Sequence, residues 1–231
     1  MKADYDVTER YRPRTIDEFV GNDKTVAAVR WWLQRGVGGH KFWISGPSGA
    51  GKTTLALILA HAVADPYNVH TYVGRELTPV TIKRLKRLLP CYAIGVKSGR
   101  AVVINEAHTL RTEAIELLLD LLEPVPGHVV VVATTTKAGQ KKLFGEELDA
   151  GPLLGRFTPL ALSNQALSEP FGQRFREIAL AEGFDVPLAK AIRIVSEAHN
   201  SLRAALDWIG STESMDYIIG DDPPAGALAV A

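Results

Sequence analysis

One glycine-rich segment constrains the fold of this chain more than any other feature. Residues 46–53 read Gly-Pro-Ser-Gly-Ala-Gly-Lys-Thr and fit the pattern G-x-x-x-x-G-K-[ST]. The apolar run Lys41–Ser45 precedes this segment, and a helical pattern over Lys52–Ala64 follows it. In such a setting the glycines let backbone N–H groups turn around phosphate oxygens, and the helix N-terminus adds its dipole. The sequence therefore predicts a strand–loop–helix unit that binds the phosphates of a nucleotide.

The residues of this loop have distinct expected roles. Lys52 neutralises charge on the β- and γ-phosphates, and the Thr53 hydroxyl ligates Mg²⁺. The expected cofactors are thus ATP and Mg²⁺. We assign nucleotide binding to the loop and the residue that follows it, namely Gly46, Pro47, Ser48, Gly49, Ala50, Gly51, Lys52, Thr53 and Thr54.

Strand-like and helical patterns alternate through residues 1–162. Most of the expected strands are apolar on both faces, which is typical of strands buried between two helix layers. After Lys41–Ser45 they are Val69–Val73, Ala101–Asn105, Val129–Ala133 and Leu160–Leu162. The other helices expected in this part are Asp23–Arg35, Pro79–Leu89 and Thr112–Leu122. This alternation predicts an α/β fold with a five-stranded parallel sheet between helices.

After about residue 163 the pattern becomes entirely helical. The expected helices are Gln165–Glu182, Pro187–His199 and Leu202–Ile209. We therefore divide the chain into a nucleotide-binding domain over residues 1–162 and a small helical lid domain over residues 163–210. The segment 211–231 is rich in Gly, Asp and Pro and is expected to be poorly ordered.

Composition excludes several classes of protein. The 231 residues carry 26 basic and 26 acidic side chains and are 46% hydrophobic, as in ordinary globular proteins. The lone cysteine, Cys91, rules out a disulfide framework and a multi-cysteine zinc site. The polar N-terminus does not resemble a secretory signal, and no apolar run approaches the roughly 20 residues needed to span a bilayer. We expect a cytoplasmic protein with no membrane partner.

A second motif supplies the candidate catalytic residues. The apolar run Ala101–Asn105 is followed by Glu106, where ATPases of this kind place an acidic residue that polarises the attacking water. Asn105 occupies the position where a metal-supporting Asp is usual. We expect Asn105 to contact Mg²⁺ through water and, because it brings no charge, to weaken Mg²⁺ affinity or hydrolysis. Thr135 is a candidate sensor of the γ-phosphate, although a Thr run after a strand also fits ordinary β-propensity.

Together these segments resemble the clamp-loader branch of the AAA+ ATPases. The resemblance is strongest to the family of the bacterial DNA polymerase III gamma/tau subunit, with the replication factor C small subunits next, and it runs from about Glu9 to Ile209. Its most specific parts are the N-terminal box Glu9–Asn22 and the stretch Leu118–Val129, which reads Leu-Leu-Asp-Leu-Leu-Glu-Pro-Val-Pro-Gly-His-Val.

The resemblance implies roles for residues that carry little signal by themselves. The segment that folds over the adenine is expected to contribute Tyr11, Arg12, Pro13 and Val20. Thr135 falls on the sensor-1 position. Arg156 falls on a catalytic arginine finger that reaches into the ATP site of a neighbouring subunit, and Arg203 on sensor 2, over the γ-phosphate. Apart from the resemblance, both arginines also fit ordinary surface positions.

The chain also departs from the family pattern. Gly155 and Phe157 replace Ser and Cys on either side of Arg156, and Asn105 replaces Asp. The cysteine cluster of the gamma/tau zinc module is missing from the sequence. The third helical domain of the family, which forms a pentameric collar, would begin where this sequence ends.

Local charge indicates a nucleic-acid partner despite the zero net charge. Residues 77–105 contain six basic side chains and no acidic one. A basic helix face neutralises phosphates without reading base sequence, although a solvated helix face gives the same pattern. The resemblance places the matching helix along a channel for primer–template DNA. The candidate DNA contacts are Lys83, Arg84 and Arg87.

We therefore predict an ATPase subunit of a DNA polymerase sliding-clamp loader, acting in a bacterial cell or a phage-infected host. Its expected partners are ATP, primer–template DNA, a sliding clamp, and other clamp-loader subunits or further copies of itself. Two alternatives stay open. One is a nucleotide-binding scaffold with little or no hydrolysis, because of Asn105. The other is a different AAA+ ATPase that remodels DNA or loads a helicase.

Overall fold

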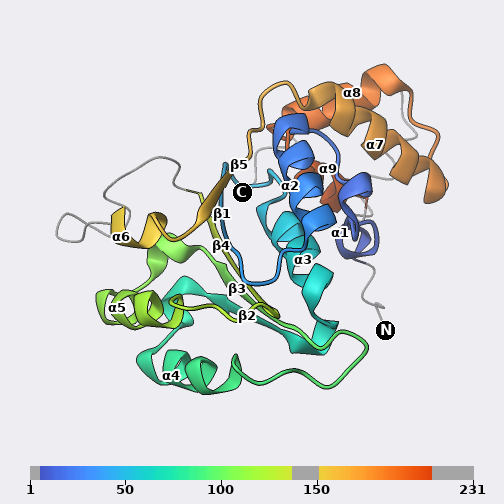
Figure 1. The fold of residues 1–231 in the computed structure, drawn as a ribbon. Helices are drawn as coiled ribbons and strands as arrows, with labels where there is room; N and C mark the ends of the chain where they lie inside the picture. Colours follow the sequence, from blue (N-terminus) through green and yellow to red (C-terminus); the bar gives the residue numbers. More distant parts are fainter. Residues whose placement is uncertain (1–5, 137–150, 210–231) are drawn as a thin grey trace, which may run out of the picture.

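A five-stranded parallel sheet organises most of the computed structural model, which describes residues 6–136 and 151–209 (Figure 1). The strands are β1 (Lys41–Ser45), β2 (Val69–Val73), β3 (Arg100–Asn105), β4 (Val129–Thr135) and β5 (Thr158–Ala161). Their order across the sheet is β2-β3-β4-β1-β5, and every neighbouring pair is parallel. The carboxyl ends of all five strands therefore lie at one edge, which is where open α/β sheets bind ligands.

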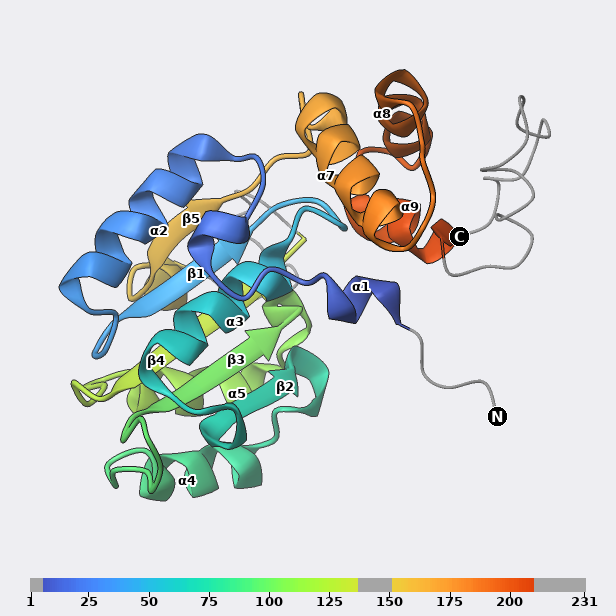
Figure 2. The same cartoon turned by 90° about the vertical axis from the view of Figure 1, so that its right-hand side faces the viewer.

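Two helix layers cover the sheet, one on each face (Figures 1 and 2). One layer contains α2 (Asp23–Arg35) and α3 (Lys52–Val63), and the other contains α4 (Pro79–Leu88) and α5 (Thr112–Leu121). Side chains alternate along each strand, so β4 divides its valines between the two layers. Val130 and Val132 pack with α2 and α3, whereas Val129 and Val131 pack with α4 and α5.

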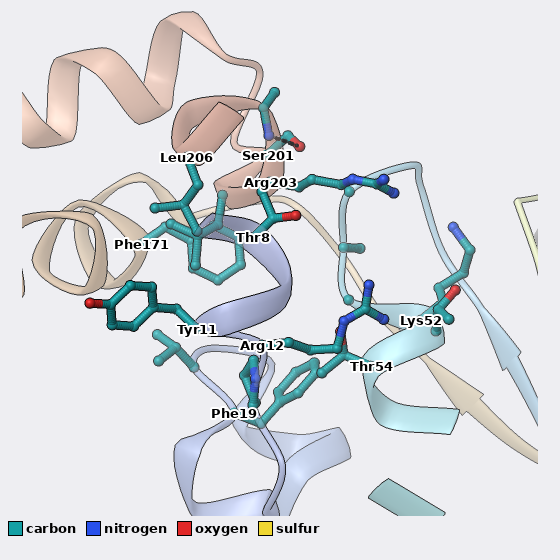
Figure 3. Close-up of a pocket in the computed structure, with 18 of the residues that line it drawn as sticks. Thr8, Tyr11, Arg12, Phe19, Lys52, Thr54, Phe171, Ser201, Arg203 and Leu206 are labelled. Carbon is teal, nitrogen blue, oxygen red and sulfur yellow. Dashed lines mark hydrogen bonds between the residues drawn. The ribbon is translucent and has the colours of Figure 1, made fainter. Parts of the chain in front are cut away.

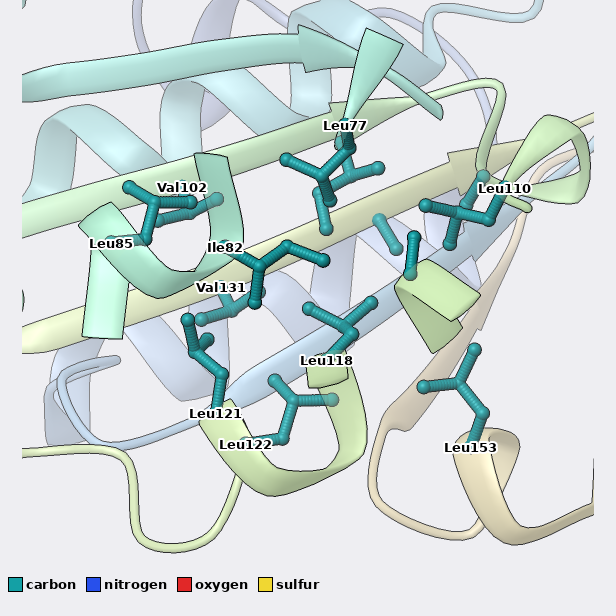
Figure 4. Close-up of a cluster of buried hydrophobic side chains, with 14 of the residues drawn as sticks. Leu77, Ile82, Leu85, Val102, Leu110, Leu118, Leu121, Leu122, Val131 and Leu153 are labelled. Carbon is teal, nitrogen blue, oxygen red and sulfur yellow. The ribbon is translucent and has the colours of Figure 1, made fainter. Parts of the chain in front are cut away.

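The layer under α4 and α5 is a continuous apolar core (Figure 4). Leu85 of α4 and Leu118 of α5 are each 2% exposed and close over the odd-numbered valines of β4. Every residue of β4 is buried, as expected of a central strand between two helix layers. This packing holds the carboxyl ends of β3 and β4 rigidly beside each other.

A separate helical unit lies beside the sheet and consists of α7 (Ser168–Ala181), α8 (Leu188–Glu197) and α9 (Leu202–Ile209). Its buried side chains form their own cluster, apart from the two sheet layers. The short N-terminal helix α1 (Val7–Arg10) contributes Val7 to this cluster. Helix α1 therefore packs against the helical unit. The division into domains at residue 162 stays a prediction.

The α/β fold with its parallel sheet is confirmed, and most expected elements are present. The bounds of α2, β1, β2 and α9 agree with the predicted ranges, and the other predicted elements shift by a few residues at their ends. Elements that the patterns did not indicate are α1, α6 (Gly151–Leu154) and the 3₁₀ turns Ile16–Glu18, Pro66–Asn68, Gly74–Glu76 and Ala107–Thr109. The disorder expected for 211–231 falls outside the described residues. Within the described ranges, no helix is both long and apolar enough to cross a membrane.

Candidate functional site

A cleft of about 480 Å³ lies between the phosphate loop, the N-terminal segment and the helical unit (Figure 3). Its position beyond β1 follows from the sheet, since the loop continues directly from the carboxyl end of that central strand. The lining residues are Thr8, Tyr11, Arg12, Pro13, Glu18, Phe19, Val20, Ser48–Thr54, Glu106, Phe171, Arg174, Ser201–Ala204, Leu206 and Asp207. Most of the nucleotide-binding residues predicted from the sequence therefore meet at one cavity.

The glycines of the loop satisfy both a backbone conformation and a close approach. Gly49 and Gly51 have φ values of +77° and +88°, in the left-handed region that favours glycine. A Cβ atom at Gly51 would lie 2.8 Å from the Phe19 ring, and one at Gly49 would lie 2.4 Å from the Ser201 Oγ. The loop is thus held between Phe19 of the N-terminal segment and Ser201, which directly precedes α9, so a side chain at either glycine would push these walls apart.

Lys52 is a buried cation at the floor of the cleft. Lys52 is the first residue of α3, and only 7% of it is exposed. Its Nζ donates a hydrogen bond to the Pro47 carbonyl oxygen over 2.8 Å. Burial lowers the pKa of Lys52, and the nearby Glu106 carboxylate opposes that shift. A charge kept out of water in this way gains strongly from an anion such as a phosphate.

Asn105 organises the end of the site where a metal would bind. Its Oδ1 accepts hydrogen bonds from Thr53 Oγ1 over 3.3 Å and from Thr134 Oγ1 over 3.2 Å. The phosphate-loop helix and strands β3 and β4 therefore meet at one amide oxygen. The hydroxyl and amide oxygens fit Mg²⁺, which prefers oxygen ligands and is usually shared between a few protein groups, water and phosphates. This geometry is compatible with the predicted metal roles of Thr53 and Asn105.

Glu106 follows β3 and borders the cleft. Its backbone is left-handed (φ 51°), a costly conformation for a residue other than glycine and one that occurs often at functional sites. Its Oε2 lies 3.3 Å from His108 Nδ1 and accepts a hydrogen bond from Thr136 Oγ1 over 3.5 Å. The carboxylate that would polarise the attacking water is therefore held at the carboxyl ends of β3 and β4.

His108, which was not among the predicted site residues, connects two of the predicted catalytic residues. The same Nδ1 that faces Glu106 lies 3.1 Å from Thr135 Oγ1. Thr135 is fully buried and lies in β4, so it reaches Glu106 through the imidazole. The spacing Glu-x-His after a buried strand indicates that His108 lies near Glu106, whereas its contact with Thr135 depends on the pairing of β3 with β4.

Four cationic side chains line the cleft, and three of them come from the N-terminal segment, the phosphate loop and α9. Figure 3 shows Arg12 of the N-terminal segment, Lys52 of the loop and Arg203 of α9 extending into the same space. Arg12 is also paired with Glu9. A polyanion such as a triphosphate is the ligand that such an arrangement favours.

Residues from the helical unit complete the cleft and were not predicted. Apart from Arg203 they include Phe171, Arg174, Ser201, Leu206 and Asp207. Burial raises the pKa of Asp207, and the charge of Arg203 opposes that shift.

Two residues that were predicted to bind nucleotide, Gly46 and Pro47, are not among the residues that line the cleft. A Cβ at Gly46 would come within 2.7 Å of the Leu162 carbonyl oxygen, so this glycine lets the loop pass the end of β5.

Arg156 lies apart from this cleft, between α6 and the end of α5. Its Nε is 3.0 Å from Glu123 Oε1, and its Nη1 donates to the Pro152 carbonyl oxygen over 2.6 Å. The side chain is 26% exposed. The structure therefore does not bring Arg156 together with the phosphate loop of its own chain, which is the arrangement that a finger for a neighbouring site requires.

The candidate DNA contacts occupy the outer face of α4. Lys83, Arg84 and Arg87 are exposed, while Ile82 and Leu85 face the core. The neighbouring Lys86 is ion-paired with Asp120 of α5 and so is partly neutralised. The basic face of α4 therefore excludes Lys86 and consists of the three predicted DNA contacts, Lys83, Arg84 and Arg87.

The parallel sheet, the phosphate loop after β1 and the acidic residue after β3 define a P-loop NTPase fold of the AAA type. In agreement, residues 42–150 match the sequence profile of the ATPase family associated with various cellular activities (AAA). Residues 42–150 are therefore similar to an AAA domain.

The curated relatives that the chain resembles include replication factor C subunits. It is 25% identical to "Replication factor C small subunit 2" of Pyrobaculum aerophilum, over 96% of this chain and 68% of the relative. It is 25% identical to a replication factor C small subunit of Thermofilum pendens (95% and 66%) and 26% identical to a large subunit of Methanococcus vannielii (86% and 40%). The chain thus spans about two thirds of the small subunits and less of the large one. These relatives are archaeal, and the bacterial or phage setting stays a prediction.

Solved structures confirm the fold. The Thermotoga maritima RuvB Holliday junction branch migration motor matches with a TM-score of 0.68 and 24% identity, over 90% of this chain and 67% of that one. A point mutant of the same motor matches with a TM-score of 0.70 and 23% identity, over 92% of this chain and 69% of that one. At this identity the likeness concerns the fold.

Proposed function

We propose that this chain is an ATPase subunit of a sliding-clamp loader, which uses ATP binding and hydrolysis to open a clamp and place it on primer–template DNA. One observation carries the proposal: the groups for holding a triphosphate meet in one cleft, while Arg156 lies elsewhere on the surface. A site divided in this way suits an ATPase that turns over at the contact between subunits. The similarity to replication factor C subunits over nearly the whole chain supports the same function.

The residues of the cleft act on the triphosphate in different ways. Lys52 and the backbone N–H groups of the loop bind its phosphates, and Arg203 stabilises charge at the γ-phosphate. Glu106 orients and polarises the attacking water. Mg²⁺ held by Thr53 and, through water, by Asn105 would supply charge neutralisation at the phosphates. Tyr11, Pro13 and Val20 form the wall that receives the adenine.

Arg156 acts on the site of a neighbouring subunit in this proposal. To do so it exchanges its contact with Glu123 for the phosphates of the nucleotide bound next door. The nucleotide is therefore held by one chain and its hydrolysis is completed by another, which links turnover to assembly on a clamp and DNA.

The basic face of α4 binds the DNA in the same proposal. Lys83, Arg84 and Arg87 neutralise backbone phosphates, which are the same at every base pair, so this binding does not read the base sequence. Such binding weakens as salt rises.

A second candidate is a nucleotide-binding scaffold that hydrolyses slowly. It is favoured by Asn105, whose amide oxygen is engaged by both Thr53 and Thr134 and brings no charge to the metal. Steady-state ATPase with and without primed DNA and a sliding clamp separates the two candidates. Stimulation by both supports the loader, whereas ATP binding without stimulated turnover supports the scaffold.

Solution mass tests the assembly that the loader requires. With ATP·Mg²⁺ and primed DNA we expect a complex of several subunits, formed by this chain or with its partner subunits. A strict monomer under every condition would leave Arg156 without a target and would reject the loader mechanism.

A further inference from the structure

A nearly buried carboxylate ties the N-terminal segment to the helical unit. The side chain of Glu182, which follows the last turn of α7, is only 6% exposed. Its Oε1 accepts a hydrogen bond from Tyr11 Oη over 2.6 Å and one from Arg10 Nη1 over 3.0 Å. These partners stand 171 and 172 positions away in the sequence. The contact is therefore tertiary and joins the two ends of the fold.

The two ends that Glu182 joins form two walls of the cleft. Tyr11 lines the cleft together with Arg12 and Pro13, and α9 supplies Arg203 from the other side. Both walls share one apolar cluster, since Tyr11 and Val7 pack with the buried side chains of α7, α8 and α9. The N-terminal segment thus belongs physically to the helical unit, although it precedes the sheet in the sequence.

We propose that Glu182 is a positioning residue for the nucleotide: it holds Tyr11 and Arg10 against the helical unit, so that the adenine wall and Arg203 close on the nucleotide as one body. The inference rests on the nucleotide site of the proposed function and is independent of clamp loading. Glu182 lies outside the lining of the cleft and acts through Tyr11.

The physical basis is the free-energy cost of removing the carboxylate that accepts hydrogen bonds from Tyr11 and Arg10. A hydrogen bond to a carboxylate is stronger than a neutral one, and a half-buried hydroxyl that loses its acceptor pays to regain water. Without the carboxylate the segment keeps its apolar packing but is held less firmly against the helical unit, so the bound nucleotide must do more to order it. That requirement weakens binding without changing the groups that carry out hydrolysis.

Equilibrium titration of fluorescently labelled ATP and steady-state kinetics on the full chain test the inference. We expect Glu182→Ala to raise the Kd and KM for ATP about tenfold, the loss typical of one charged hydrogen bond, with kcat within about twofold. Glu182→Gln keeps an acceptor for Tyr11 and should weaken binding about threefold. The matched control is Glu197→Gln, which alters an exposed carboxylate paired with Arg193 on α8 and should leave binding unchanged.

A double-mutant cycle shows whether Glu182 acts through the tyrosine. Tyr11→Phe removes the hydroxyl and keeps the ring that lines the cleft. Since both variants break the same bond, Tyr11→Phe combined with Glu182→Ala should bind ATP within about twofold of Glu182→Ala by itself. Effects that multiply independently would overturn the positioning role.

Limited trypsin digestion gives a second readout that does not depend on activity. Arg10 and Arg14 offer cleavage sites in the segment that Glu182 holds, whereas Pro13 blocks cleavage after Arg12. We expect Glu182→Ala and Glu182→Gln to accelerate cleavage there without nucleotide, and ATP to restore protection at higher concentrations than in the wild type. If Glu182→Ala unfolds, Glu182→Gln decides the matter by both measurements. Wild-type ATP affinity in a folded Glu182→Ala would overturn this inference by itself, whereas a wild-type chain that binds no ATP would overturn the proposed function as well.

Discussion

The phosphate end of the cleft and the surface around Arg156 differ in how much of their chemistry one chain supplies. At the phosphate end Lys52 is almost fully buried, and three elements meet at Asn105. Around Arg156, the guanidinium is partly exposed and its ionic partner, Glu123, is 62% exposed. The first region is prepared to bind a ligand without help. In the second region Arg156 can exchange Glu123 for another anionic partner. Mutations in the two regions should therefore separate nucleotide binding from nucleotide hydrolysis.

The most complete loss should come from Lys52→Met at the phosphate end, because a chain that does not bind ATP cannot turn it over at all. Loss of the buried cation should weaken ATP binding by at least about 100-fold, the scale of removing one preorganised charge-stabilising group. Burial disfavours the charged form of Lys52, so the nucleotide-free Tm should not fall. Thermal melts should therefore show an unchanged Tm without ATP and loss of the Tm increase with ATP.

The matched control is Lys24→Met on the exposed side of α2. It should keep both the affinity and the ATP-dependent rise in Tm. Wild-type affinity in Lys52→Met would show that the phosphates bind elsewhere.

Arg156→Ala tests the other region. Assembly-stimulated ATPase should fall about 1000-fold, the scale of an arginine finger, while the Kd for ATP changes less than about twofold. The reason is that Arg156 lies outside the cleft of its own chain. Stimulated turnover is measured with clamp and primed DNA, and binding is measured by titration. Arg193→Ala on α8 is the control, and equal loss of binding and turnover would reject the finger role.

Local sequence patterns predict the strands and the phosphate loop but not the contacts between distant elements. Local patterns sufficed for the strands, because a run such as Val129–Val132 is apolar at every position, and for the loop, because its eight residues are contiguous. The contact of His108 with Thr135 and that of Glu182 with Tyr11 could not be predicted. Each depends on how strands order in the sheet or how distant helices pack, and neither leaves a local period in the sequence.

Asn105→Asp tests whether the missing negative charge at the phosphate end limits hydrolysis. An added charge near a divalent cation is worth on the order of 1 kcal/mol in water-like surroundings, so turnover should rise roughly three- to tenfold. The hydroxyls of Thr53 and Thr134 can still donate to the new carboxylate, so the local geometry should persist. Steady-state ATPase over a series of Mg²⁺ concentrations measures the effect. Unchanged turnover at saturating Mg²⁺ would show that the missing charge does not limit hydrolysis.

The smallest effect belongs to Glu123→Gln, which addresses the exchangeable region most directly. Since an exposed ion pair contributes about 0–1 kcal/mol, its loss should change Tm little. The pair competes with the phosphates of the neighbouring site for Arg156, so weakening it should raise stimulated ATPase about two- to threefold. ATP binding by the chain itself should not change, because Glu123 borders α6 rather than the cleft. Glu197→Gln removes a comparable exposed pair on α8 and should have no such effect. A fall in stimulated ATPase with Glu123→Gln would instead mean that Glu123 orients Arg156 for its neighbour, and the surface around Arg156 would then be as preorganised as the phosphate end.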